Sequence, residues 1–305
     1  MPDKIIKVAA IQTAPVFLNK KATVKKACAL IAEAAESGAN LVIFPEAFIP
    51  AYPDWVWSMP PGKKAGLNDL YNDLIENAIS IPDEATKELC SAAKKAGVIV
   101  VMGISERNSE SSGASLYNTL LYIDDSGNIL GKHRKLIPTG GERIVWAQGD
   151  GSTLQAFDTK WGKLGGLICW ENYMPLARQA MYSQGVQIYI AATWDSSDIW
   201  LASMRHIAKE GGMFVISSCT GLRIDDIPDH YEFKKLYPEG REWINQGNST
   251  IIAPNGNIIA GPMNKEQGIL YAELDMSLIP AAKWILDTAG HYARPDVFAF
   301  EVRQN

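Results

Sequence analysis

Several features common in proteins are scarce in this sequence, and each scarcity excludes a class of function. The 305 residues contain four cysteines, widely separated and without the C-x-x-C spacing of metal or redox sites. No apolar run is long enough to span a membrane, and no apolar signal segment follows the first residues. The formal net charge of −5 offers no basic surface to a nucleic acid. We therefore expect a cytoplasmic protein with no nucleic-acid, membrane or metal partner.

The sequence does contain an alternation of short apolar runs with helical patterns. Strands are expected where runs rich in β-branched or apolar residues end at turn residues: 5–12, 41–44, 98–104, 116–123, 129–132, 154–157, 161–162, 164–168, 187–192, 213–218, 248–253, 257–260 and 269–274. Helices are expected where apolar residues recur at helical spacing: 23–37, 83–95, 175–184 and 199–209. The lysines from Lys20 to Lys26 are expected to form the solvated face of the first helix.

Two turn sequences within this alternation narrow the fold class. Asp124–Asn128 and Pro254–Gly256 each separate two strand patterns as a hairpin turn does. A purely parallel sheet would not contain hairpins, and an all-β sandwich would not contain the helices. Two sheets packed face to face, with helices on both outer sides, accommodate both features. We expect one α/β domain over residues 1–305, built as a four-layer α-β-β-α sandwich.

The stretch from Leu164 to Leu176 has the layout of a nucleophilic site. An apolar strand pattern ends at Cys169, and Pro175 suits the first turn of a following helix. Backbone N–H groups and a helix dipole aimed at the sulfur would favour the thiolate form. From this stretch alone, however, packing as a small buried hydrophobe is the commoner interpretation of such a cysteine.

Three further residues stand where a buried strand or a loop meets polar residues. Glu46 directly follows a strand and Pro45, where burial would raise the pKa of a carboxyl toward the range of a general base; an ordinary surface carboxylate is the alternative. Lys135 ends a run of four basic residues and precedes two apolar ones, so we expect it to turn inward. His133 is interpreted as part of a solvated basic turn. Glu142 lies in a glycine-flanked loop, with an ordinary loop carboxylate as the alternative.

Four motifs contain these residues in the order Glu, Lys, Glu, Cys: Phe44–Glu46, His133–Leu136, Gly141–Arg143 and Gly166–Asn172. Together they resemble the nitrilase superfamily of carbon–nitrogen hydrolases, and the similarity extends over nearly the whole chain. The resemblance implies a triad of Glu46 as general base, Lys135 as electrostatic stabiliser and Cys169 as nucleophile. It also implies that Glu142 positions Lys135 and the attacking water, and that the backbone N–H of Trp170 donates to the developing anion.

Within that superfamily, the segment Cys169–Leu176 looks like the true nitrilase branch. The resemblance therefore implies hydrolysis of a small-molecule nitrile to a carboxylic acid and ammonia through a covalent thioimidate and acyl-enzyme, without a cofactor. An amidase of the same superfamily and a non-catalytic binding member are the alternatives. The substitutions Cys169→Ala, Glu46→Gln and Lys135→Ala are each expected to abolish turnover in a folded protein.

Aromatic residues crowd the loops that carry the motifs. Tyr52, Trp57, Trp146 and Tyr173 are candidates for the wall of an apolar pocket that takes aromatic or arylaliphatic nitriles; the alternative is that they anchor the loops onto the sheets. Trp194 is interpreted as structural.

The resemblance also implies self-association, as a homodimer or a larger homo-oligomer, filaments included. The helices expected at 175–184 and 199–209 carry apolar residues suited to such an interface. The C-terminal segment from about residue 277 is expected to extend to a partner subunit.

Overall fold

The computed structural model describes residues 5–59, 64–110 and 112–304, and its strands form two sheets. The strands of the first sheet are β1 (Ile5–Gln12), β2 (Leu41–Ile43), β3 (Ile99–Arg107), β4 (Leu116–Ile123), β5 (Ile129–Arg134) and β13 (Gly268–Asp275). Those of the second sheet are β6 (Phe157–Thr159), β7 (Gly162–Gly166), β8 (Ile188–Thr193), β9 (Phe214–Cys219), β10 (Gly221–Arg223), β11 (Trp243–Ile252) and β12 (Ile258–Asn264). The first sheet has the order β13-β1-β2-β3-β4-β5. The second has the order β10-β11-β9-β8-β7-β6, with β12 also paired to β11.

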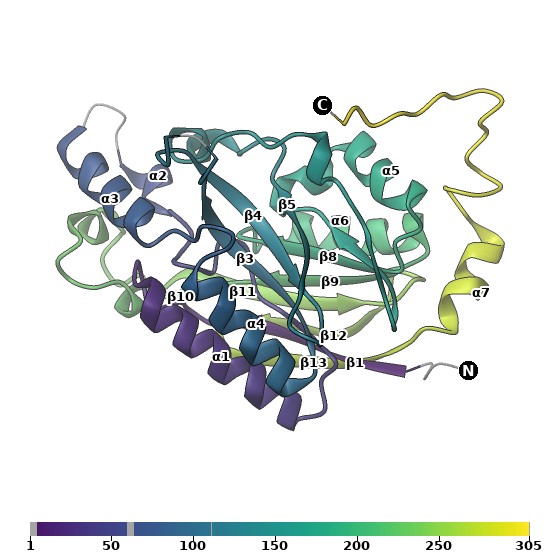
Figure 1. Cartoon of the computed structure of the whole chain (residues 1–305), viewed down its shortest axis with the longest axis horizontal. Helices are drawn as coiled ribbons and strands as arrows, with labels where there is room; N and C mark the ends of the chain where they lie inside the picture. Colours follow the sequence, from purple (N-terminus) through teal and green to yellow (C-terminus); the bar gives the residue numbers. More distant parts are fainter. Residues whose placement is uncertain (1–4, 60–63, 111, 305) are drawn as a thin grey trace.

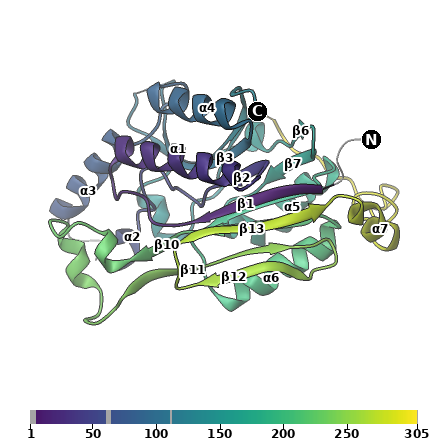
Figure 2. The same cartoon turned by 90° about the horizontal axis from the view of Figure 1, so that it is seen from below.

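Helices cover the outer face of each sheet. The helices are α1 (Lys20–Glu36), α2 (Trp55–Ser58), α3 (Lys64–Glu76), α4 (Glu84–Ala96), α5 (Pro175–Ser183), α6 (Asp198–Gly211) and α7 (Leu278–Ile285). Figures 1 and 2 show α1 and α4 against the first sheet, and α5 and α6 on the opposite side of the molecule. The four-layer α-β-β-α sandwich expected from the sequence is therefore confirmed.

Side chains alternate between the two faces of each strand, so the two sheets build three apolar layers: one between the sheets and one on the outer face of each sheet. In β2, Val42 packs outward against α1 and α4, while its neighbour Ile43 packs inward with Ile190 and Ile216 of the second sheet. Met181 of α5 belongs to the outer layer of the second sheet. Because successive strand residues point to opposite faces, an unbroken apolar run fits a strand buried on both sides.

The strand directions place the carboxyl ends of several strands together at one end of the first sheet. Strands β1, β2 and β3 are parallel, and two antiparallel pairings, β3 with β4 and β4 with β5, return β5 to that same direction. In the second sheet, β7, β8 and β9 are likewise parallel. Residues that directly follow β2, β5, β7 and β8 thus lie at carboxyl ends of strands, where α/β proteins place their sites.

Both hairpins expected from the sequence are present, but two local expectations are wrong. The strand expected at 154–157 begins only at Phe157, the first residue of β6, because the side chain of Gln184 bonds Leu154 O and Ala156 N in place of a neighbouring strand. The lysines of α1 are not all solvated: Lys26 Nζ donates to Ala14 O at 2.7 Å, and Lys20 Nζ to Ala78 O at 2.9 Å.

The C-terminal segment leaves the body after α7, loops outward and returns toward α5, as Figure 1 shows. It carries apolar side chains that are largely exposed, among them Trp284 at 81% and Phe298 at 69%. Near its end Val302 packs against the outer layer of the second sheet. No helix within the described ranges is both long and apolar enough to cross a membrane.

Candidate active site

Cys169 sits at a sharp turn between β7 and the helix that follows. It begins a short 3-10 helix, Cys169–Tyr173, and has a φ of +51°, which a non-glycine residue rarely adopts. In α/β-hydrolases a nucleophilic serine stands at a strained strand-to-helix turn of this kind. Just upstream, a Cβ on Gly166 would stand 2.0 Å from Ile190 O, so only glycine lets β7 approach β8 this closely.

The segment after Cys169 is tied to β5 and the residues that follow it by one buried carboxylate. Glu171 accepts hydrogen bonds from Leu136 N at 2.6 Å and Ile168 N at 2.8 Å, and it pairs with His133 Nε2 at 3.0 Å. Burial opposes the charge of Glu171, but His133 and the two backbone donors outweigh it and lower the pKa of the carboxyl. The expectation of a solvated His133 is therefore wrong: its side chain is buried, where it contacts Glu171 and Thr153 O.

Glu46 lies in a loop that runs beside β3 rather than out to solvent. Phe44 N donates to Val101 O at 2.8 Å, and Ile49 N donates to Gly103 O at 3.2 Å. A Cβ on Gly103 would stand 2.0 Å from Pro45 O, so this glycine allows the loop to lie against the sheet. As a result, the carboxyl of Glu46 is completely buried.

Lys135, directly after β5, turns inward as expected and joins the two glutamates. Its Nζ donates to Glu46 Oε1 at 2.8 Å and to Glu142 Oε2 at 2.7 Å, and all three side chains are buried. Glu142 stands in a 3-10 helix, Gly140–Ile144, where its Oε2 also accepts from Thr139 N at 2.8 Å. Two well-separated loops thus hold one ammonium between two carboxylates.

One oxygen of this cluster is left open. Glu46 Oε1 accepts from Lys135 and from Asn118 Nδ2, the latter at 2.7 Å, whereas Oε2 is buried without a hydrogen-bond partner among the described residues. A buried carboxylate oxygen without a donor is costly unless something else, such as a substrate or a water, supplies one. The thiol of Cys169 has a donor of its own: Thr193 Oγ1 donates to Cys169 Sγ at 3.2 Å and orients the thiol.

The electrostatics of the cluster assign a proton state to each group. Burial, opposed by Lys135 and reinforced by Glu142, raises the pKa of the Glu46 carboxyl above its usual range. Burial alone would lower the pKa of Lys135, but Glu46, Cys169 and Glu142 raise it overall, so the ammonium persists at neutral pH. Burial and the charge of Glu46 raise the pKa of the Cys169 thiol well above its ordinary value. Burial and the charge of Glu46 thus oppose the thiolate form that the helix terminus was expected to favour.

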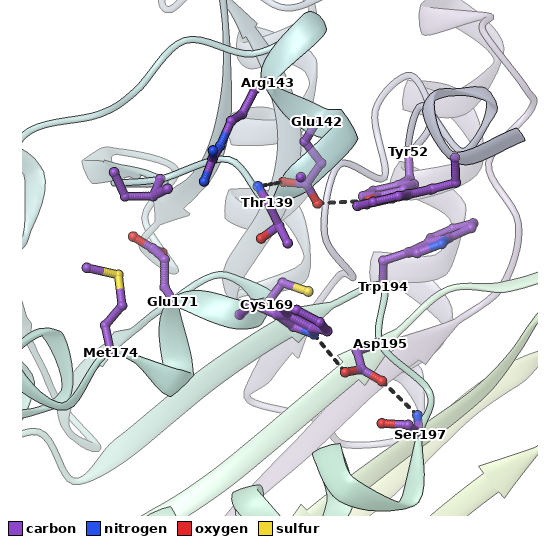
Figure 3. Close-up of a pocket in the computed structure, with 14 residues that line it drawn as sticks. Tyr52, Thr139, Glu142, Arg143, Cys169, Glu171, Met174, Trp194, Asp195 and Ser197 are labelled. Atoms are coloured by element: carbon purple, nitrogen blue, oxygen red, sulfur yellow. Dashed lines mark hydrogen bonds between the residues drawn. The ribbon is translucent and has the colours of Figure 1, made fainter. Parts of the chain in front are cut away.

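A cavity of about 880 Å³ opens onto this cluster at Cys169 and Glu142, and aromatic side chains form part of its wall. Figure 3 shows the carboxylate of Glu142 directed toward the sulfur of Cys169, with the rings of Tyr52 and Trp194 stacked beside them. Trp57 and Trp170 also line the cavity, and each side chain is about half exposed, at 51% and 50%.

Two of the four aromatic candidates from the sequence lie elsewhere. Within the described residues, neither Trp146 nor Tyr173 lines this cavity: Trp146 is buried and donates to Ser105 Oγ, and Tyr173 packs edge-on against Trp170. Trp194, which we interpreted as structural, instead forms part of the cavity wall.

Sequence reasoning also missed Asn118 and Thr193. Both occupy ordinary positions within strand patterns, so only the pairing of strands reveals that their side chains reach the cluster. Among the residues that the structure describes, no group of three or more His, Cys, Asp or Glu side chains is arranged to hold a metal ion.

Removing the central cation is expected to cost stability as well as activity. In Lys135→Ala, Glu46 and Glu142 would lose their buried counter-ion, which should lower the free energy of unfolding by about 3–5 kcal/mol. The matched control is Lys132→Ala, because Glu106 keeps Arg134 as a partner there. Chemical denaturation of both variants measures the free energy of unfolding. An equal loss of that free energy in the two variants would contradict the expected stabilisation by Lys135.

Comparison with models of protein families assigns the chain to a class of hydrolases that act on carbon–nitrogen bonds. Residues 7–283 match the carbon-nitrogen hydrolase family, and the chain belongs to that family. An aliphatic nitrilase of Sinorhizobium fredii is 43% identical over 301 residues, which cover 96% of this chain and 94% of the relative. Nitrilase 2 of Arabidopsis thaliana is 41% identical over 314 residues, covering 99% and 89%. The resemblance drawn from the four motifs is confirmed.

Solved structures agree with this assignment at the level of the fold. Nit3 of Saccharomyces cerevisiae, a member of the nitrilase superfamily, superposes with a TM-score of 0.73 at 23% identity, covering 94% of this chain and 96% of that one. A carbon–nitrogen hydrolase of Helicobacter pylori G27 gives a TM-score of 0.75 at 21% identity, covering 97% and 99%.

Proposed function

We propose that this protein is a nitrilase, which converts a small organic nitrile and two water molecules into a carboxylic acid and ammonia. The observation that carries the proposal is the buried cluster itself: Lys135 pairs with Glu46 and Glu142, Glu46 Oε2 has no hydrogen-bond partner among the described residues, and Glu142 and Cys169 line one cavity. The preference for a nitrile over an amide follows the relatives named nitrilases at 41–43% identity.

The first step forms a bond between Cys169 and the nitrile carbon. Because the thiol rests in its protonated form, Glu46 takes its proton through the open Oε2 as the sulfur attacks. Negative charge then develops on the nitrile nitrogen, and the Lys135 ammonium stabilises it. The backbone N–H of Trp170 is the second donor, since the first residues of a 3-10 helix lack intrahelical acceptors for their N–H groups. Protonation of the nitrogen gives a thioimidate.

Two hydrolytic steps complete the cycle. Glu46 removes a proton from water, which adds to the thioimidate carbon, and the tetrahedral intermediate expels ammonia to leave a thioester on Cys169. A second water, activated in the same way, releases the carboxylic acid and restores the thiol. Glu142 keeps Lys135 in place throughout, because it holds one of the N–H donors of that ammonium. The cycle uses only side chains of this chain and no cofactor.

The cavity wall favours nitriles with an aromatic or arylaliphatic substituent. Tyr52, Trp57, Trp170 and Trp194 present ring faces and edges to the cavity, and such walls bind flat apolar groups. A panel of aliphatic, arylaliphatic and aromatic nitriles, compared by kcat/KM, ranks these classes directly.

The test of the proposed function is a matched pair of substrates, one nitrile and the amide with the same substituent, with ammonia and acid measured for each. A nitrilase releases both products from the nitrile, and any free amide is a minor product. Faster turnover of the amide together with an inert nitrile would make the protein an amidase. An absence of products from both would make it a binding protein.

The pH dependence of the reaction should report the environment of Glu46. The base must be ionised to accept the thiol proton, and burial raises its pKa above the ordinary value of 4.5. Activity should therefore fall with decreasing pH at a higher pH than an ordinary glutamate would cause. A profile of kcat/KM for a nitrile that does not ionise measures this limb. Full activity down to about pH 4.5 in a folded enzyme would contradict the assignment of Glu46.

We also propose that the chain acts as a single cytoplasmic domain that assembles into a homodimer or a larger homo-oligomer, filaments included. The exposed apolar residues Leu176, Ile199, Trp284 and Phe298, on α5, α6 and the C-terminal segment from about residue 277, support this contact. Four unpaired cysteines, one of them the proposed nucleophile, suit a reducing compartment. Light scattering that detects only monomers would refute the assembly.

A further inference from the structure

Tyr52 makes a set of contacts that a simple pocket wall would not need. Its hydroxyl donates to Glu142 Oε1 at 2.8 Å, and the phenol oxygen of Tyr52 accepts from Trp57 Nε1 at 3.0 Å. The residue is only 3% exposed although it borders the cavity. The hydroxyl of Tyr52 is therefore directed to Glu142 in the catalytic cluster, while the residue also borders the cavity.

The two hydrogen bonds of Tyr52 determine the direction of its proton. Indole N–H groups can only donate, so Trp57 makes the phenol oxygen an acceptor on one side. The phenol hydrogen is then left for Glu142, a carboxylate that can only accept when ionised. Burial, Glu142, Glu46 and Cys169 all raise the pKa of Tyr52, so it remains a neutral donor at every pH at which the enzyme is folded.

The ring of Tyr52 is held as firmly as its hydroxyl. It stacks on Trp194 with ring centroids 4.3 Å apart and an interplanar angle of 8°, and Trp146 packs edge-on at 5.7 Å. Trp194 in turn donates to Asp54 Oδ1 at 3.1 Å. A ring held by contacts with two tryptophans gives its hydroxyl a fixed position, which is what a group that orients another residue requires.

We propose that Tyr52 is a positioning residue for the reaction, which holds Glu142 in the orientation that presents Lys135 to the nitrile nitrogen. Glu142 divides its two oxygens between partners: Oε1 receives Tyr52, and Oε2 receives Lys135 and Thr139 N. Without the phenol, Oε1 loses its donor and the carboxylate is held through Oε2 alone, so Lys135 is fixed less firmly between Glu142 and Glu46. This inference rests on the proposed function, because it assigns Lys135 to the charge that develops during attack by Cys169.

The test is Tyr52→Phe, which removes one oxygen and keeps the stacked ring. We expect kcat to fall by about tenfold to a hundredfold, the range for loss of one hydrogen bond to a charged group, with KM nearly unchanged. The fold loss should be the same for a small aliphatic nitrile and for an arylaliphatic one. If Tyr52 were only a wall, KM would change instead, and the change would vanish for the small nitrile. Either that pattern or an unchanged kcat overturns the proposal.

The matched control is Tyr71→Phe, since the Tyr71 hydroxyl donates to Ala114 O outside the cavity. This variant should retain wild-type kcat and KM, and thermal unfolding should show that both variants are folded. A loss of kcat in Tyr71→Phe equal to that in Tyr52→Phe would mean that the effect is not specific to the Glu142 contact.

A second measurement separates this inference from the proposed function. The rate at which iodoacetamide alkylates Cys169, followed by mass spectrometry, reports the reactivity of the thiol without any nitrile. Tyr52→Phe should slow this labelling several-fold, because a displaced Lys135 stabilises the emerging thiolate less well. If the wild-type enzyme turns over amides but no nitrile, the proposed function fails, and the same comparison of kcat on the amide still decides the role of Tyr52. Unchanged labelling together with unchanged kcat would refute it.

Discussion

Cys169→Ala is expected to reduce turnover by about 10⁴-fold or more while the protein remains folded. The sulfur forms the bond to substrate in the proposed mechanism, and no other thiol lines the cavity among the described residues. Alanine removes one atom beside Thr193 and leaves the Glu46–Lys135–Glu142 contacts in place. Release of ammonia measures activity, and circular dichroism monitors the fold.

The matched control for this variant is Cys28→Ala. Cys28 lies in α1, where alanine suits the helix, and no residue of α1 lines the cavity. It should keep wild-type activity. Mass spectrometry of the native enzyme with a nitrile should find the covalent adduct on Cys169. An adduct confined to Cys28, Cys90 or Cys219, or near-normal turnover by Cys169→Ala, would end the assignment of the nucleophile.

Glu46→Gln is expected to lower kcat by about 10²–10⁴-fold, the usual contribution of a general base. The substitution is conservative at this position, because the glutamine oxygen can still accept from Lys135 and Asn118. Its NH₂ group would take the place of Oε2, the oxygen without a partner among the described residues, and would exchange a proton acceptor for a donor there. The variant should therefore fold normally but lose most of its turnover.

Another buried carboxylate provides the comparison for Glu46. Glu106 of β3 pairs with Lys132 and Arg134 and does not line the cavity within the described residues. Glu106→Gln should lower the free energy of unfolding yet retain most of the turnover per folded molecule. If Glu46→Gln kept more than about a tenth of the wild-type rate, far above the range for a lost base, Glu46 would not be the general base.

The local patterns of the chain predicted the main elements with small shifts at their ends. The helix expected at 83–95 runs from Glu84 to Ala96, because Asp83 caps its start and Gly97 adopts the left-handed conformation at its end. The pattern for 154–157 failed because a side chain from a distant helix supplies its hydrogen bonds, which no local rule anticipates.

The candidate site was predicted in its central residues and mispredicted around them. Glu46, Lys135, Glu142 and Cys169 stand in recognisable motifs, so their proximity could be expected before any coordinates. Asn118, Thr193 and Trp194 enter the site through the pairing of strands and the loops that follow, and nothing in their immediate neighbours marks them.

The sequence by itself determined the class of this protein: the order of most strands and helices, the inward turn of Lys135, and the motifs of Cys169 and its partners depend on short-range chemistry. The elements α2, α3, α7 and β10 were not expected from it. Only the tertiary structure decided the proton states and the geometry. Packing between the two sheets raises the pKa of the Cys169 thiol, leaves Glu46 Oε2 without a hydrogen-bond partner among the described residues, and joins Tyr52 to Glu142 across 90 residues of chain. Those properties arise from desolvation and long-range contact, which a linear pattern does not encode.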